Sequence, residues 1–241
     1  TNIGLVTVYQ AYATVCTYPV QLVNKISENF RAGFGVRLAS KEKNLYGDFQ
    51  RLLTFHMFTG IIAIAVFVTN VNALIRLWIG NEFTLGRTGV CLFALNMIQR
   101  MTANAIYIVR NGMGMFEESK AFSIREAIMN LFLSIVLVKH FGIEGVMAAT
   151  VIAVYLGLLP GNSNLVFHDI FHRKNTLILD YLVMILTIGL SVGAYYLLMG
   201  RIIIDSWGQI LLSVGMQMIL AILIGSVILG IYKVKYLRRS L

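Results

Sequence analysis

The stretch that decides the fold is LLTFHMFTGIIAIAVFVTNVNALI, residues 52–75. These 24 residues contain no Asp, Glu, Lys or Arg. A helix that crosses the hydrocarbon core of a bilayer needs about 20 apolar residues. The stretch shows no alternation of polar and apolar residues, so a strand of a transmembrane barrel fits it poorly. We therefore predict a membrane-spanning α-helix here.

Similar apolar runs recur on both sides of this stretch, at residues 1–24, 88–109, 127–138, 145–167, 181–200 and 206–232. The run at 88–109 contains one charge, and the run at 127–138 reaches full length only if polar turns extend it and Lys139 snorkels to the interface. The whole chain of 241 residues is 58% hydrophobic and 13% charged, whereas about 25% charged residues is usual in soluble domains. The predicted fold is an all-α polytopic transmembrane helix bundle with about seven spans.

The basic residues lie mostly on one side of this predicted bundle. Alternate connections between the spans lie on the same side of the membrane. One side then holds 14 of the 20 Lys and Arg residues and the other side 4, while Lys25 and Arg100 lie inside spans. Basic loops remain in the cytoplasm, so residues 31–51, 110–125 and 168–176 and the C-terminus are predicted to be cytoplasmic. Because the topology accounts for the net charge of +9, we expect no nucleic-acid partner.

The connections between helices give finer expectations. We expect helices over about 6–38, up to 75, 84–110, up to 140, 145–160, 177–200 and 207–232. Residues 41–47 should form a turn, and 141–145 a connection short enough to make an antiparallel hairpin. Pro160-Gly161 should end or kink the fifth helix, and Gly33-Phe-Gly35 should be a hinge or a close-packing point. The chain starts at Thr1 rather than Met, so we expect a missing N-terminal portion.

Signatures of catalysis are absent from the sequence. It has no P-loop, no His-Glu-x-x-His, no Cys-x-x-Cys and no Gly-x-Ser-x-Gly. His168 and His172 are four residues apart, but no further ligand cluster accompanies them, so a solvated loop is a better interpretation than a metal site. We therefore expect no enzyme, no catalytic residue, no metal and no cofactor.

The most informative residue is Arg100, near the middle of an apolar run. A charge at that depth costs about 2.5–3.5 kcal/mol even on the lenient insertion scale, and it normally faces a cavity or a partner. Asn96, Arg100 and Asn104 are spaced i, i+4 and i+8, which places them on one stripe of a helix. Two interpretations remain open: a structural arginine tied to carbonyls or an acidic neighbour, and a water-filled cavity that accepts anions.

Other polar residues are candidates for the same cavity. Lys25 and Glu28 could pair with each other, or snorkel at the cytoplasmic end of their helix. Glu126 and Asn130 form a second i, i+4, i+8 stripe with a serine, and such residues either bond neighbouring helices or line a cavity. Tyr9, with two further tyrosines of the first run, could belong to an interfacial belt or stack on sugar rings.

Several motifs together resemble a known family. Val8-Tyr-Gln-Ala-Tyr12 is similar to the Val-Gly-x-Tyr-Ser-Asn-Tyr opening of a helix in Wzx-type bacterial polysaccharide flippases, members of the multidrug/oligosaccharidyl-lipid/polysaccharide exporter superfamily. Ile75-Arg-Leu-Trp-Ile-Gly80 resembles their Phe-Ile-x-Leu-Trp-Ile-Gly. The best match is Glu126-x-x-x-Asn130-x-x-x-Ser134, followed by Gly142-Ile-Glu-Gly-Val146. The chain departs from the family at Thr7 and over residues 31–39.

The resemblance implies the C-terminal portion of a MATE-like exporter fold. Residues 1–160 would resemble the second exporter lobe without its first helix, and residues 161–241 would add two C-terminal transmembrane helices. It implies a flippase that moves a polyprenyl-pyrophosphate-linked oligosaccharide between leaflets of the bacterial cytoplasmic (inner) membrane. Implied partners are this substrate, membrane lipid and other polysaccharide-assembly membrane proteins. The alternatives are a cation-coupled drug exporter of the same fold, a membrane-embedded transferase, and a non-transporting scaffold of an export complex.

Overall fold

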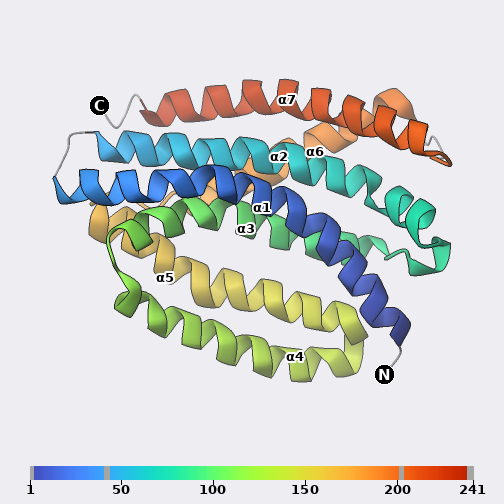
Figure 1. Cartoon of the computed structure of the whole chain (residues 1–241), viewed down its shortest axis with the longest axis horizontal. Helices are drawn as coiled ribbons and strands as arrows, with labels where there is room; N and C mark the ends of the chain where they lie inside the picture. The colour runs from blue at the N-terminus through green and yellow to red at the C-terminus, as the bar shows by residue number, and fades with distance from the viewer. Residues whose placement is uncertain (1–2, 41–43, 201–203, 238–241) are drawn as a thin grey trace. The chain divides into compact units, whose positions relative to one another are not determined.

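A computed structural model describes residues 3–40, 44–200 and 204–237, and over these residues it is helical, without a strand (Figure 1). In chain order the elements are α1 (Ile3–Ala39), α2 (Leu45–Trp78), the 3₁₀ turn η1 (Asn81–Phe83), α3 (Arg87–Gly112), α4 (Phe116–Ala153), the π-helical turn η2 (Val154–Leu158), α5 (Leu159–Asn164), the π-helical turn η3 (Leu165–Ile170), α6 (Leu177–Met199) and α7 (Trp207–Leu237).

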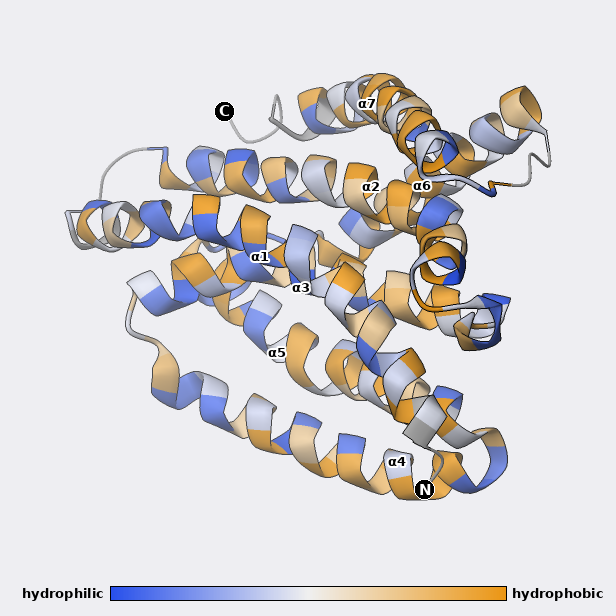
Figure 2. Cartoon of the chain, turned by 45° about the vertical axis from the view of Figure 1, so that its right-hand side comes forward, coloured by the Kyte–Doolittle hydropathy of each residue, from blue (hydrophilic) through white to orange (hydrophobic). Residues whose placement is uncertain are grey.

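Within the described residues, four helical segments are long and apolar enough to cross a membrane, over Leu45–Trp78, Phe116–Ile170, Leu177–Met199 and Trp207–Val234. Their outward surfaces carry large apolar side chains, such as Phe132 on α4, Leu197 on α6 and Ile231 on α7, and Figure 2 shows how far apolar residues dominate α6 and α7. Monomeric soluble proteins rarely expose so many large apolar side chains together. The structure thus supports an all-helical, membrane-embedded protein, while the number of seven spans stays a prediction.

The chain forms two compact units. Unit 1 comprises residues 1–21, 57–98 and 181–241, and unit 2 comprises residues 22–56 and 99–180. The proposed division at residue 160 remains a prediction; that residue lies within unit 2, in α5.

A hairpin inside unit 2 confirms the expected short connection at 141–145. Gly142 interrupts the helical conformation of α4 with φ +57° and ψ −134°, and the chain turns back there (Figure 1). The two arms then approach so closely that a Cβ on Gly145 would lie 2.3 Å from the carbonyl oxygen of Leu137. Glycine is therefore needed twice, at Gly142 for its backbone conformation and at Gly145 for lack of space.

The second arm of the hairpin does not end at Pro160, so of the two expected outcomes, an end or a kink, the end is wrong. Pro160 lies in the first turn of α5, directly after η2, and helical structure continues to Ile170. π-helical turns lie on both sides of α5. They shift the hydrogen-bond register around the proline, so the helix passes through it.

The loop boundaries also differ from expectation. Residues 41–43 of the expected turn lie outside the described residues, and residues 45–47 already belong to α2.

The predicted close packing at Gly33-Phe-Gly35 is found at Gly35, where an added Cβ would lie 2.9 Å from the carbonyl oxygen of Gly112 on α3. These two glycines let α1 and α3 touch backbone to backbone.

A buried hydrogen-bond network joins the helices of unit 1. The Ser213 hydroxyl on α7 donates to the side-chain oxygen of Asn70 on α2, and it also hydrogen-bonds the Tyr195 hydroxyl on α6. One turn further along α7, Gln217 donates to the Ser191 hydroxyl at 2.8 Å. Helices in lipid gain little from apolar contact alone, so such polar contacts hold them together.

Candidate functional site

One polar, partly buried face runs along α3. The residues there follow a spacing of three or four, which one helix stripe requires, and each is partly buried: Asn96, Arg100, Asn104, Tyr107 and Asn111. Between them lie fully buried apolar residues, including Met101 and Ile108. From Asn96 to Asn111 the face extends about 22 Å along the helix axis.

The predicted stripe of Asn96, Arg100 and Asn104 thus lies on a single continuous helix. Asn96 belongs to the part of α3 in unit 1, and Arg100 and Asn104 to the part in unit 2. The amide nitrogen Nδ2 of Asn104 is buried and has no hydrogen-bond partner among the described residues. A buried donor without a partner costs about 1–3 kcal/mol, so this position favours a ligand or a water that accepts a hydrogen bond.

At the end of this face, Arg110 organises a polar cluster within unit 2. Its Nη1 donates to the side-chain oxygen of Asn162 at 2.7 Å, and its Nε and Nη2 donate to that of Asn111 at 3.1 and 2.8 Å. The guanidinium also stacks on the Tyr107 ring at 4.8 Å. Its hydrogen-bond partners are neutral amides, so its positive charge is not cancelled through these contacts.

Glu126 on α4 is an acidic group beside this cluster. It is close enough to Tyr107 for an electrostatic interaction. The backbone of Glu126 packs directly on Gly157, where an added Cβ would lie 3.0 Å from its Cα. The neighbouring Arg125 donates to the Gly157 carbonyl oxygen from Nε at 2.9 Å. The two arms of the hairpin are therefore in direct contact at Glu126 and Gly157.

The structure places Asn130 in the hairpin contact. Its side-chain oxygen accepts hydrogen bonds from Ser134, at 3.2 Å, and from Thr150 on the opposite arm, at 3.4 Å. Of the two interpretations of the Glu126–Asn130–Ser134 stripe, these contacts favour helix-to-helix bonding for Asn130.

On α1, the expected pairing of Lys25 with Glu28 is not formed. Among the described residues Glu28 pairs instead with Arg31, at 4.0 Å between Oε1 and Nη2, because that residue is also one turn away. Lys25 and Glu28 are exposed. Glu28 lies seven residues, or two turns, before Gly35, on the face of α1 that touches α3 at Gly112.

Tyr9 belongs to unit 1 and has an aromatic partner there. Its ring lies 5.5 Å from that of Phe93 on α3, and its exposed fraction is 41%. Tyr12, one turn on, is fully buried; its hydroxyl donates to the side-chain oxygen of Asn72 and accepts from the Leu85 backbone N–H. Tyr12 therefore has a structural role, whereas Tyr9 keeps an open ring face.

Sequence analysis missed Tyr107, Arg110 and Asn162. The first continues the spacing of the polar stripe and could have been found by extending it. Arg110 was counted with a cytoplasmic connection, and it lies in the last turn of α3. Asn162 gave no signal, since only folding of the hairpin brings it to Arg110.

For metals, the described residues contain no group of three His, Cys, Asp or Glu side chains that could hold an ion. His168 is hydrogen-bonded to its neighbour Asp169, with 2.7 Å between Nδ1 and Oδ1, on an exposed surface. The side chains that contact Arg110 carry amide and tyrosine groups, and together with the guanidinium they suit the binding of anions and hydroxyl groups.

Comparisons with models of known protein families, with curated proteins and with solved structures find no match to this chain.

Proposed function

We propose that this chain is part of a flippase that moves a polyprenyl-pyrophosphate-linked oligosaccharide from the inner to the outer leaflet of a bacterial cytoplasmic membrane. The observation that carries the proposal is the polar face of α3, with Arg100 within it and Arg110 at its end, in an otherwise apolar, membrane-embedded bundle. A charge at membrane depth is costly and usually marks a substrate pathway.

The chemistry of this face suits each part of such a substrate. Arginine offers a planar fork that matches phosphate, and the hydrogen bonds of Arg110 to neutral amides leave its charge available. Asn96 and Asn104 offer both donors and acceptors to sugar hydroxyls. The lipid tail would remain outside, among the acyl chains, against the apolar outer surface of the helices.

The proposal includes a MATE-like arrangement of about seven spans with a cytoplasmic C-terminus. In that arrangement this chain would form the second lobe, without its first helix, and the preceding part of the protein the first lobe. Rocking of two such bundles about a central site would give alternating access to the two leaflets.

The test replaces Arg100 in the full-length protein. A hydrogen bond to a charged group is worth about 1.5–3 kcal/mol, so Arg100→Ala should lower flipping of the lipid-linked oligosaccharide about ten- to a hundredfold per folded molecule. Arg100→Lys should recover part of the activity if positive charge suffices, and little if the fork is needed. Arg87→Ala, at the exposed start of the same helix, is the matched control and should flip normally.

Two measurements separate this role from a structural one. Flipping is followed in proteoliposomes by accessibility of the oligosaccharide in the opposite leaflet, and folded protein by a monodisperse peak in size-exclusion chromatography. A purely structural arginine would lower the folded amount and leave flipping per folded molecule unchanged. That second pattern would refute substrate contact at Arg100.

A further inference from the structure

A groove in unit 2, separate from the α3 face, lies between the last turns of α1 and the first turns of α2. Its volume is about 490 Å³, within the range of small-molecule pockets, roughly 300–1,000 Å³. On α1 its residues recur with helical spacing at Ile26, Phe30, Gly33 and Arg37. That spacing places the groove on the side of α1 opposite to the face of Glu28 and Gly35.

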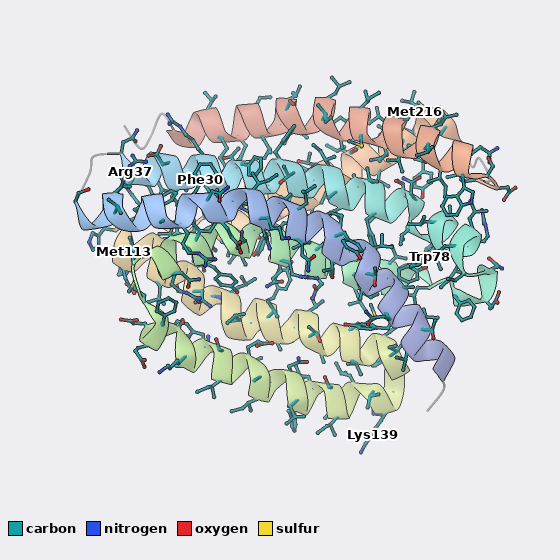
Figure 3. All side chains as sticks on the ribbon, in the orientation of Figure 1. Phe30, Arg37, Trp78, Met113, Lys139 and Met216 are labelled. Carbon is teal, nitrogen blue, oxygen red and sulfur yellow. The ribbon has the colours of Figure 1, made fainter. Side chains whose placement is uncertain are left out.

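The walls of the groove are apolar and open to the outside. Ile26, Phe30 and Phe55 are 49%, 53% and 36% exposed. Phe30 and Arg37 lie along the same part of α1 (Figure 3). Gly33 keeps the groove open, since a Cβ there would meet no atom within 4 Å.

One end of the groove is positively charged. Asp48 on α2 forms salt bridges with two arginines. Nη2 of Arg37 lies 2.7 Å from the Asp48 Oδ2, and Nη1 of Arg51 lies 3.2 Å from the Asp48 Oδ1. The charged residues that line the groove are Arg37, Arg51 and Asp48, so its lining has more positive than negative groups. The Arg51 side chain is 73% exposed and can turn a face of its fork to a further anion.

The length of the groove matches one leaflet of a bilayer. From Ile26 to Arg37 is about 17 Å along the helix, close to half of the roughly 30 Å hydrocarbon core. The charged end lies at the start of the α2 span and the apolar part beside its interior. By the charge bias of the loops, that end faces the cytoplasm.

We propose that this groove binds an anionic phospholipid of the leaflet at the basic end of the helices. The phosphate would lie on Arg51 and Arg37, and an acyl chain would lie along Phe30, past Gly33 towards Ile26. The complementary charge distinguishes this lipid from the lipids that merely surround the protein, since basic groups at a membrane surface attract anionic headgroups. The site does not depend on the proposed flippase activity.

The test uses a tryptophan placed in the groove. The full-length protein with Phe30→Trp is reconstituted in vesicles of phosphatidylcholine that contain chain-brominated phosphatidylglycerol or chain-brominated phosphatidylcholine. Bromine quenches tryptophan on contact, and the signal of the native tryptophans is measured without Phe30→Trp and subtracted. Brominated phosphatidylglycerol should give the same quenching as brominated phosphatidylcholine at a mole fraction at least about fivefold lower. A roughly fivefold preference is what the attraction of one basic residue for an anionic headgroup supplies.

Two variants test the two ends of the site, each with a matched control. Arg51→Gln should reduce the preference for phosphatidylglycerol about fivefold, whereas Lys174→Gln, an exposed basic residue outside the groove, should leave it unchanged. Gly33→Leu should fill the groove and lower quenching by phosphatidylglycerol to the phosphatidylcholine level. Gly189→Leu, at an exposed glycine of α6 with equally open surroundings, should not.

Three outcomes would overturn the proposal. Equal quenching by the two brominated lipids would show surrounding lipid only. An unchanged preference for phosphatidylglycerol in Arg51→Gln would show that the basic end of the groove does not cause the lipid selectivity. Displacement of brominated phosphatidylglycerol by polyprenyl phosphate at a lower mole fraction than by unbrominated phosphatidylglycerol would assign the groove to the transported lipid.

Discussion

Replacing Gly145 with alanine tests how closely the arms of the α4 hairpin must pack. The added Cβ would lie 2.3 Å from the Leu137 oxygen, 2.6 Å from its carbonyl carbon and 3.1 Å from its Cβ. Ordinary contacts between carbon atoms are about 3.5–4.0 Å. The arms must therefore separate by roughly 1 Å, and because backbone atoms are involved, no side-chain rotation can avoid this.

The energy follows from two opposing effects. Overpacking of this kind costs about 1–3 kcal/mol, and the separation also loses a quarter to a half of the attraction at each contact it opens. Alanine returns about 1 kcal/mol through helix propensity. We expect a net loss of about 1–2 kcal/mol from these terms, and a larger loss and a lower folded yield for Gly145→Leu.

The assay is thermal unfolding of the full-length protein in detergent, followed by size-exclusion chromatography of heated samples. Gly189→Ala is the control, because its Cβ would meet no atom within 4 Å; there alanine should keep or raise the Tm. A Tm for Gly145→Ala equal to or above that of the control would refute the backbone contact.

Two further predictions concern the topology and the packing of unit 1. Single cysteines are placed in a background without Cys16 and Cys91 and probed in intact cells with an impermeant thiol reagent. Cysteines at Asn81 or Lys139 should react, and cysteines at Lys120 or Lys174 should not, because basic connections stay in the cytoplasm. Labelling at position 120 or 174 would contradict the predicted orientation. Ser213→Ala should lower stability by about 1–3 kcal/mol, since it leaves the buried Asn70 and Tyr195 groups without a partner. Ser226→Ala, an exposed position of the same helix, is its control, and equal Tm values for the two variants would show that the network contributes nothing.

The sequence alone determined the class of fold and much of the candidate site. Backbone groups in lipid must be satisfied within their own segment, so long apolar runs without alternation required helices. Gly142 and Gly145, separated by two residues, indicated a tight hairpin. The spacing of Asn96, Arg100 and Asn104 placed them on one stripe, because helix periodicity is local and readable from spacing.

Only the tertiary structure decided which of the polar residues meet. Asn130 faces Thr150 across the hairpin, Arg110 reaches Asn162 on α5, and Arg37 meets Asp48 at the mouth of the groove. Each of these contacts depends on how two helices are rotated and offset against each other. Close backbone approaches such as Gly35 on Gly112 set that rotation and offset, and since they join residues far apart in the chain, no local spacing encodes them.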